Sequence, residues 1–302
     1  MKNFSEHKLS VALCTYNGSK YLRKQLDSIL SQTYVPDEII IVDDCSTDNT
    51  RNILSEYALA NSKIKVYFNE KNLGSNLTFR KAIYLAQGDF IALCDQDDIW
   101  FNNKLEIQMF EIMQVDDPYS KPLLHFHDLR LMSDDEVVIE DSFWKLHNFN
   151  ANTFRFQDLF LFNIVTGCTC IINEQLKINL LKSDMRNIIM HDYLIALIAY
   201  GFGTVLFSNS QLMLYRSHHS SVTTKIKMTY SSRIQSFIKR VNGNEYLKPN
   251  ILQMDAFLSL FSNKLSEIYR AESETFVSLL NTSFIKRFKY KWHDSRQKNK
   301  NS

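Results

Sequence analysis

The sequence predicts an α/β protein with a mostly parallel sheet, an antiparallel extension of that sheet, and C-terminal helices. Short apolar runs alternate with amphipathic segments over the first hundred residues. Polar or acidic residues follow three of these runs, and from about residue 225 the pattern becomes helical and basic. Strand–helix alternation at this spacing is typical of a parallel sheet covered by helices.

Four strands and three intervening helices are expected in the first hundred residues. The second helix has N-cap candidates in Ser46, Thr47 and Asp48, and Gly88 should close the third. The first helix is indicated by apolar residues at helical spacing, namely Tyr21, Leu22, Leu26, Ile29 and Leu30. The expected strands cover residues 9–13, 38–42, 64–68 and 90–94.

The middle of the chain is less regular and predicts an antiparallel continuation of the sheet. A helix is expected over 191–200. Residues 193–215 carry no charge, but glycines and polar residues interrupt them, so a core helix followed by a core strand is favoured over a membrane span. The strands expected here cover residues 122–126, 136–139, 166–172, 204–207 and 211–215.

Three polar segments should meet at one edge of the sheet, because ligands of parallel sheets bind at the carboxyl ends of the strands. These segments are Thr15–Asn17, Asp43–Asp44 and Asp95–Asp98. The last places three carboxylates within four residues, and they repel one another unless a cation lies between them. Their oxygen ligands suit Mg²⁺ or Mn²⁺. A solvated acidic turn is the alternative for this segment taken alone.

Composition and charge exclude several classes of protein. A formal net charge of +2 implies no nucleic-acid partner. The absence of GxGxxG and GxxxxGK[ST] loops argues against a dinucleotide oxidoreductase or a P-loop nucleotidase. Five cysteines without a CxxC pair, and a polar N-terminus without an apolar signal core, fit a cytoplasmic protein with reduced thiols.

The C-terminal segment Phe284–Trp292 alternates apolar and cationic residues. Such a segment can lie on an anionic membrane surface, which here would be the inner face of the plasma membrane. It can equally be a C-terminal helix with one solvated face, and the sequence leaves both alternatives open.

Several motifs, in order, resemble family-2 glycosyltransferases over residues 8–220. The form of the acidic motif, with Gln96 and Ile99-Trp100, is similar to that of bacterial rhamnosyltransferase-like members. Cys45 stands where the family frequently has Gly, and Ser217 where it often has Gln. The matching segments are Val11–Gly18, Ile40–Asp48, Asn72–Gly74, Arg80, Ala86–Asp89, Cys94–Trp100 (the DxDD variant of the DxD motif), Val165–Thr169, His191–Tyr193 and Tyr215–His218.

The resemblance implies a GT-A fold, in which a Rossmann-like sheet binds the nucleotide. The glycosyltransferase domain would cover residues 1–224, with a nucleotide-sugar half of about 1–100 and an acceptor half of about 101–224; residues 225–302 would form a helical, basic extension. The donor would be a UDP- or dTDP-sugar, with dTDP-rhamnose the first to try. The acceptor would be a lipid-linked or oligosaccharide chain in capsule, O-antigen or cell-wall polysaccharide synthesis.

The resemblance also implies roles for individual residues in the donor site. Asp97 would bind the metal directly, and Asp95 would bond the ribose and metal-bound water. Asp44 would accept the imide N–H of uracil or thymine. The remaining nucleotide-sugar residues would be Thr15 and Tyr16, which flank the base, Asn17, Gln96, and Arg80 on the diphosphate.

Two further roles concern the reaction itself. Asp192 would be the general base on the face of the sugar opposite the diphosphate, which gives inversion; its alternative role is to cap the following helix. His218 would close over the metal or the diphosphate, with His191 and His219 as alternatives.

Two other functions use the same residues. A metal-dependent nucleotidyl or phosphoryl transferase would need the same carboxylates, but the chain lacks a Gly-rich or Lys-bearing phosphate loop near Thr15. A non-catalytic nucleotide-sugar-binding protein could keep the fold, although the presence of both Asp97 and Asp192 argues for catalysis.

Overall fold

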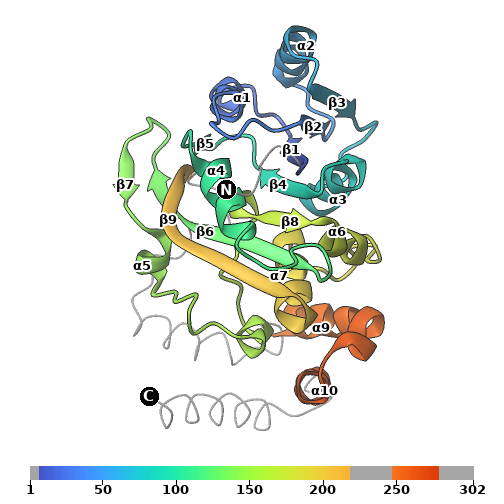
Figure 1. The fold of residues 1–302 in the computed structure, drawn as a ribbon. Coiled ribbons are helices and arrows are strands. Elements are labelled where there is room, and N and C mark those ends of the chain that lie inside the picture. Colours follow the sequence, from blue (N-terminus) through green and yellow to red (C-terminus); the bar gives the residue numbers. More distant parts are fainter. Residues whose placement is uncertain (1–6, 218–246, 279–302) are drawn as a thin grey trace.

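The computed structural model describes residues 7–217 and 247–278. Within them one mixed sheet has the strand order β3-β2-β1-β4-β8-β6-β9-β5, with β7 paired to β6. Figure 1 places β1–β4 at one end of the molecule and the helices α9 and α10 at the other. The predicted α/β class with C-terminal helices is confirmed.

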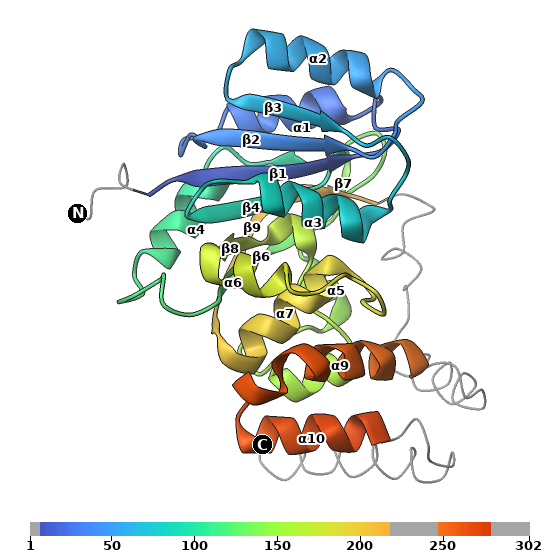
Figure 2. The ribbon, with the colours of Figure 1, turned by 90° about the vertical axis from the view of Figure 1, so that its right-hand side faces the viewer.

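The first four strands run parallel, as the alternation of apolar and amphipathic segments predicts. Central β1 and β2 are buried almost throughout, whereas the edge strand β3 is buried only at Ile64 and is partly or fully exposed after it. Figure 2 shows β3, β2, β1 and β4 stacked in this order. The elements of this half are β1 (Leu9–Thr15), α1 (Leu22–Leu30), β2 (Glu38–Asp43), α2 (Thr50–Ala60), β3 (Ile64–Phe68), α3 (Ser75–Leu85) and β4 (Phe90–Cys94).

Two expected helix ends lie elsewhere. The N-cap of α2 is Asn49, and Ser46 is engaged with Asp43 instead. Helix α3 ends at Leu85, three residues before Gly88. Gly88 has a different role: a Cβ there would lie 2.7 Å from the backbone nitrogen of Ser10, so this glycine allows the chain to pass closely over β1.

The second half departs more from the prediction. The strand expected over 166–172 is the 3₁₀ turn η3 (Gly167–Thr169) followed by β8 (Ile171–Asn173). The two strands expected over 204–215 are one long strand, β9 (Thr204–Arg216). Strand β8 is antiparallel to β4 and β6, as expected, but β6 (Leu123–Met132) and β9 run parallel to each other. The remaining elements here are β5 (Ile99–Trp100), α4 (Lys104–Ile112), β7 (Val138–Glu140), α5 (Phe143–His147), η2 (Phe156–Phe160), α6 (Glu174–Leu180) and α7 (His191–Phe202).

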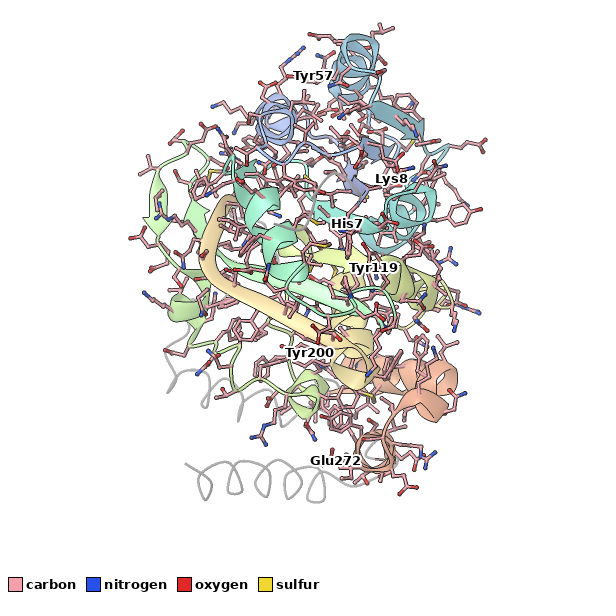
Figure 3. All side chains as sticks on the ribbon, in the orientation of Figure 1. His7, Lys8, Tyr57, Tyr119, Tyr200 and Glu272 are labelled. Atoms are coloured by element: carbon pink, nitrogen blue, oxygen red, sulfur yellow. The ribbon has the colours of Figure 1, made fainter. Side chains whose placement is uncertain are left out.

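Helices α9 (Lys248–Phe261) and α10 (Glu267–Ser278) extend the core beyond the sheet; the short turn η4 (Ser262–Lys264) joins them. Phe156 of η2 stacks on Tyr269 of α10 at 4.7 Å and contacts Phe257 of α9. In Figure 3, Tyr57 on α2 and Glu272 on α10 mark the two ends of the molecule. The helical pattern is therefore confirmed for residues 248–278.

The uncharged stretch 193–215 forms most of α7 and β9, which confirms the expected core helix and strand. Across residues 7–217 and 247–278, no helix is long and apolar enough to cross a membrane. His218, His219 and the segment Phe284–Trp292 lie outside the described residues.

Candidate active site

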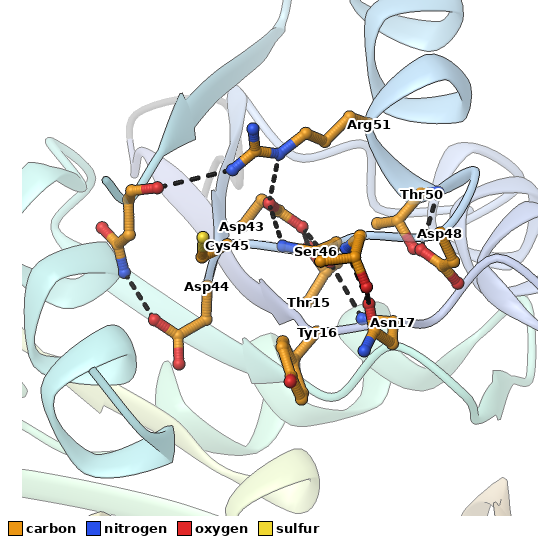
Figure 4. A network of polar contacts seen from close by, with 12 residues as sticks. Thr15, Tyr16, Asn17, Asp43, Asp44, Cys45, Ser46, Asp48, Thr50 and Arg51 are labelled. Carbon is orange, nitrogen blue, oxygen red and sulfur yellow. Dashed lines mark hydrogen bonds and ion pairs between the residues drawn. The ribbon is translucent and has the colours of Figure 1, made fainter. Parts of the chain in front are cut away.

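The loops after β1 and β2 are interlocked by side-chain hydrogen bonds, which bring the first two polar segments together (Figure 4). The Thr15 hydroxyl donates to Asp43 at 3.0 Å. The Asn17 amide N–H donates to the Ser46 hydroxyl at 2.9 Å, and Asn17 Oδ1 accepts from the N–H of Thr47 at 2.9 Å. Asn17 has a φ of 48°, a left-handed conformation that Asn tolerates better than most residues. These hydrogen bonds hold the loop after β1 and the loop after β2 together as one rim, although the two loops lie far apart in the sequence.

Asp43 is a buried charge that holds this rim together. Its side chain is fully buried and accepts from Arg51 Nε at 3.1 Å, from the Ser46 hydroxyl and from the Ser46 N–H. Figure 4 shows Asp43 turned toward Arg51 and Ser46, whereas Asp44 points away from them. One aspartate of the pair is therefore occupied by the protein itself.

Asp44 anchors the loop that leads into α3. Its Oδ1 accepts from Asn69 Nδ2 and the Leu73 N–H, and its Oδ2 from the Gly74 N–H, each at 2.8 Å. Burial alone would raise the pKa of this carboxyl, but these hydrogen bonds outweigh it and hold the pKa below its usual value. Asp44 is therefore an anion at neutral pH. The next residue, Cys45, has a φ of 67°, which explains why glycine is frequent at this position in the family it resembles.

Gln96 joins the first polar segment to the acidic motif. Its Oε1 accepts from the Tyr16 N–H at 2.8 Å and its Nε2 donates to the Tyr16 carbonyl at 3.0 Å. The Gln96 amide lies so close to Gly18 that a Cβ there would be 2.1 Å from Gln96 Oε1. The Tyr16 ring is 48% exposed, so it offers a surface at the mouth of the site.

The carboxylates after β4 lie in a poorly solvated environment. Burial and the neighbouring charges of Asp97 and Asp192 raise the pKa of Asp95 to about 7. Burial, together with Asp97 and Asp95, raises the pKa of Asp98 well above its usual value. Asp98 Oδ2 has no conventional hydrogen-bond donor among the described residues, and the nearby Cys168 thiol is only a weak donor. Asp98 therefore has fewer hydrogen-bond donors than Asp43 or Asp44.

Asp192 faces this acidic motif from the first turn of α7. Its Oδ2 accepts from the Gly167 N–H at 3.2 Å, and its Oδ1 from Asn163 Nδ2 at 3.4 Å. Burial raises its pKa to about 6 in spite of these hydrogen bonds. The N-cap of α7 is Met190, so Asp192 is not the capping residue. A carboxyl whose pKa lies near neutrality, close to other carboxylates, is a candidate for proton transfer.

His191 packs beneath Asp192 and does not face the carboxylates as a polar partner. Its ring stacks on Phe79 at 4.0 Å, and neither ring nitrogen has a hydrogen-bond partner in the described part of the chain. Burial lowers its pKa to about 3, so the imidazole is neutral. A Cβ on Gly167 would lie 2.9 Å from His191 Nε2, which keeps the η3 turn against α7.

Arg80 bonds to backbone carbonyls away from the carboxylates, and His218 lies outside the described residues. Arg80 Nε donates to the Ser183 carbonyl and its NH2 group to the Leu181 carbonyl, each at 2.8 Å. These bonds tie α3 to the end of α6, and the diphosphate role of Arg80 stays a prediction. The described residues of this part of the chain end at Ser217, so the metal role of His218 also stays a prediction.

Lys104 is a buried cation beside the acidic motif to which the sequence assigned no role. It donates to Gln108 Oε1 at 2.8 Å and lies 4.1 Å from the Trp100 ring centroid. Burial lowers its pKa to about 8, against the attraction of Asp98 and the buried thiols. The sequence shows this arrangement only as a spacing of four residues between Trp100, Lys104 and Gln108.

The acidic motif fits a hard divalent cation. Ligand atoms of Asp95, Asp98 and Cys168 all lie within 4.8 Å of one another. Carboxylate oxygens suit Mg²⁺ or Mn²⁺. Burial raises the pKa of Cys168 well above its usual value, so it stays a neutral thiol and is a poor ligand for such ions. The donor set that fits is therefore the group of carboxylates at the end of β4.

A surface depression of about 460 Å³ lies away from these carboxylates, at the amino ends of the strands. Residues 84–89 and α6 line it, and the Lys177 ammonium crosses it to the Ala86 carbonyl at 2.7 Å. None of the candidate site residues contributes to it.

Two comparisons with known sequences agree on one family. TuaG of Bacillus subtilis, whose name assigns it to teichuronic acid biosynthesis as a glycosyltransferase, is 34% identical over 167 residues, or 55% of this chain and 62% of TuaG. Escherichia coli WfgD, named as a UDP-Glc:α-D-GlcNAc-diphosphoundecaprenol β-1,3-glucosyltransferase, is 38% identical over 104 residues, or 34% of this chain and 40% of WfgD. The chain thus matches less than two thirds of the length of these relatives.

Solved structures agree on the fold. S. aureus TarS residues 1–349 in complex with UDP superposes with a TM-score of 0.54 at 19% identity, covering 90% of this chain and 70% of that one. The same protein with UDP-GlcNAc gives a TM-score of 0.52 at 21% identity, covering 90% and 80%. The sequence model of glycosyl transferase family 2 matches residues 10–171, more than half of the chain. This chain therefore belongs to glycosyl transferase family 2 and has a GT-A type fold.

Proposed function

We propose that the protein is an inverting glycosyltransferase that moves a sugar from a UDP- or dTDP-sugar to a saccharide acceptor in the synthesis of a surface polysaccharide. The observation that carries the proposal is Asp192, whose pKa is raised to about 6 and whose charge acts on Asp95. A proton acceptor thus faces the carboxylates that would hold the donor. Family membership and the names of TuaG and WfgD support the same reaction class.

The chain supplies two functions at opposite sides of the donor sugar. Asp97 would hold Mg²⁺ or Mn²⁺, which supplies a counter-charge for the departing diphosphate when it is bound, and Asp95 would bond the ribose and metal-bound water. Asp192 would accept the proton of the acceptor hydroxyl as that hydroxyl attacks the anomeric carbon. Attack from the side opposite the leaving group inverts the configuration. The Gly167 N–H and Asn163 keep the Asp192 carboxylate in place for this step.

The rim formed by the loops after β1 and β2 would bind the base. Asp44 remains ionised and can accept an imide N–H, which uracil and thymine have and cytosine lacks. The exposed ring of Tyr16 offers a stacking surface. The UDP complexes of TarS favour a uridine nucleotide, whereas the resemblance of the acidic motif favours dTDP-rhamnose as the first donor.

A donor screen tests the proposal. Release of UDP or dTDP from a panel of nucleotide sugars should need Mg²⁺ or Mn²⁺, and NMR of the product should show inverted configuration. Calorimetry should show tighter binding of UDP or dTDP than of GDP. Transfer of a nucleotidyl or phosphoryl group would favour the alternative enzyme class, and binding without turnover on any acceptor would favour a non-catalytic protein.

Peripheral membrane contact is a separate part of the proposal. The acceptor would be lipid-linked or an oligosaccharide, and Lys286, Arg287, Lys289 and Lys291 could bring the protein to an anionic surface. Basic residues contribute on the order of 1 kcal/mol each near such a surface. Deletion of residues 279–302 should therefore reduce sedimentation with anionic liposomes at low salt. Equal sedimentation of the two proteins would remove this part.

A further inference from the structure

We infer that Arg216 is a positioning residue that holds the metal-binding loop in its binding geometry. This inference rests on the proposed function, because it assumes that the acidic motif binds a divalent cation. Arg216 is the last residue of β9, and its side chain is fully buried. A buried guanidinium needs partners for its five N–H donors, and those partners come from three separate segments.

The first segment is the acidic motif itself. Arg216 Nε donates to the Asp97 carbonyl at 2.9 Å, and the Arg216 backbone N–H donates to Asp98 Oδ1 at 3.1 Å. One residue thus fixes both the peptide that follows the expected metal ligand and the next carboxylate. The Asp97 side chain is more exposed than Asp98 and is directed by the backbone that Arg216 holds.

The second segment is the turn between β6 and β7. The Arg216 NH1 group donates to the carbonyls of Ser133 and Asp134 at 3.2 and 2.9 Å, and NH2 contacts Glu136 Oε1 at 3.3 Å. Glu136 has a φ of 64°, a conformation that non-glycine residues hold only where their surroundings determine it. The ion pair with Arg216 helps to hold Glu136 in this conformation.

The third segment is the start of α1. The guanidinium lies 4.2 Å from the Tyr21 ring centroid, the Tyr21 hydroxyl donates to Asp134 at 3.0 Å, and Lys24 pairs with Glu136. We name Arg216, Tyr21, residues 133–136 and Asp97–Asp98 the arginine clamp. It connects the metal-binding loop to two other segments through one cation.

The clamp has a consequence for metal binding. The three carboxylates of the acidic motif repel one another, and without a bound metal this repulsion favours a more open loop. The hydrogen bonds of Arg216 oppose this spreading before the metal arrives, and such pre-organisation lowers the cost of binding. Lysine at this position would keep the charge but lose the forked geometry that reaches three segments.

Direct Mn²⁺ binding tests the clamp. Free Mn²⁺ is measured by its EPR signal during titration in the presence of UDP or dTDP, and thermal unfolding is followed in parallel. Arg216→Lys should bind Mn²⁺ at least about tenfold more weakly, the loss that corresponds to one or two charge-assisted hydrogen bonds. Arg23→Lys is the matched control, since Arg23 makes a two-point pair with Glu56 on the exposed face of α1. It should leave the Mn²⁺ affinity unchanged.

The outcomes separate the clamp from the proposed function. Unchanged Mn²⁺ affinity in folded Arg216→Lys overturns the clamp, even if turnover falls. If Arg216→Lys does not fold, the test uses Glu136→Gln, which removes the negative charge that pairs with Arg216. Weaker Mn²⁺ binding by this variant supports the clamp, and unchanged binding overturns it. Absence of Mn²⁺ binding by the wild-type protein would instead overturn the metal requirement of the proposed function, and the clamp with it.

Discussion

Two groups of carboxylates follow β2 and β4, the strands on either side of β1, and their charges are stabilised in opposite ways. After β2, Asp43 is paired with Arg51, and Asp44 receives three hydrogen bonds that lower its pKa. After β4, burial and mutual repulsion raise the pKa of Asp95 to about 7 and raise that of Asp98 well above its usual value. Hydrogen bonds and ion pairs keep the first group ionised at neutral pH, whereas burial and like charges make Asp95 and Asp98 favour a proton or an external cation.

This difference has an energetic side. A carboxylate with a lowered pKa stabilises the folded state at neutral pH, whereas one with a raised pKa destabilises it. Asp44 belongs to the first kind, and Asp95 and Asp192 to the second. The chain therefore gives up stability at the residues that the proposed reaction uses, which is the usual relation between stability and function at an active site.

The largest effect is expected from removal of the carboxylate that should bind the metal. Asp97→Ala should abolish metal-dependent release of UDP or dTDP, because Asp97 is the carboxylate expected to bind the metal directly. Asp184→Ala, which removes an exposed carboxylate paired with Arg186, is the control and should keep full activity. If the wild-type protein kept full turnover in excess EDTA, the acidic motif would be a solvated acidic turn and not a metal site.

Asp192→Asn should reduce the kcat of transfer by about 10²–10⁴-fold, the usual range for a general base. Donor and metal binding should be unchanged, because proton removal belongs to the transition state. In the wild-type protein, transfer should fall as the pH drops below about 6, since the protonated carboxyl cannot accept a proton. Near-wild-type transfer by the Asn variant, or a product with retained configuration, would exclude this role.

A smaller effect distinguishes the two kinds of carboxylate by stability. At pH 8, Asp44→Asn should lower the melting temperature by a few degrees, the equivalent of about 1–3 kcal/mol for lost charge-assisted hydrogen bonds. Asp192→Asn should raise it, because burial penalises the ionised Asp192 in the folded state.

The two shifts should also depend on pH with opposite sign. Asp44 has a lowered folded-state pKa, so its stabilisation is present above the ordinary value of 3.8 and is lost as the pH falls through the folded-state pKa. The folded-state pKa of Asp192 is raised, so its ionised carboxyl destabilises the folded state above a pH of about 6. This destabilisation disappears as the pH falls toward 3.8. Scanning calorimetry of both variants between pH 2 and 8 checks this; shifts of the same sign at pH 8 would contradict it.

The sequence predicted the first half of the fold well and the second half less well. Strands β1, β2 and β4 are mainly apolar runs followed by polar residues, so their local pattern and their tertiary role agree. The expected strand over 166–172 fails at Gly167–Thr169, because the Gly167 N–H bonds to Asp192 and the turn packs on His191. Strand propensity cannot register such contacts between residues 25 positions apart.

The sequence by itself determined which residues end the parallel strands, and hence that Thr15–Asn17, Asp43–Asp44 and Asp95–Asp98 share one edge of the sheet. This follows from periodicity and from the direction of parallel strands, which are local properties. Only the tertiary structure decided how each charge is treated: that Asp43 meets Arg51, that Asp98 lies between Arg216 and a buried lysine, and that Asp192 is desolvated. Burial and hydrogen bonding set the pKa of a carboxyl, and both depend on segments brought together by folding and not on the residue's neighbours in the chain.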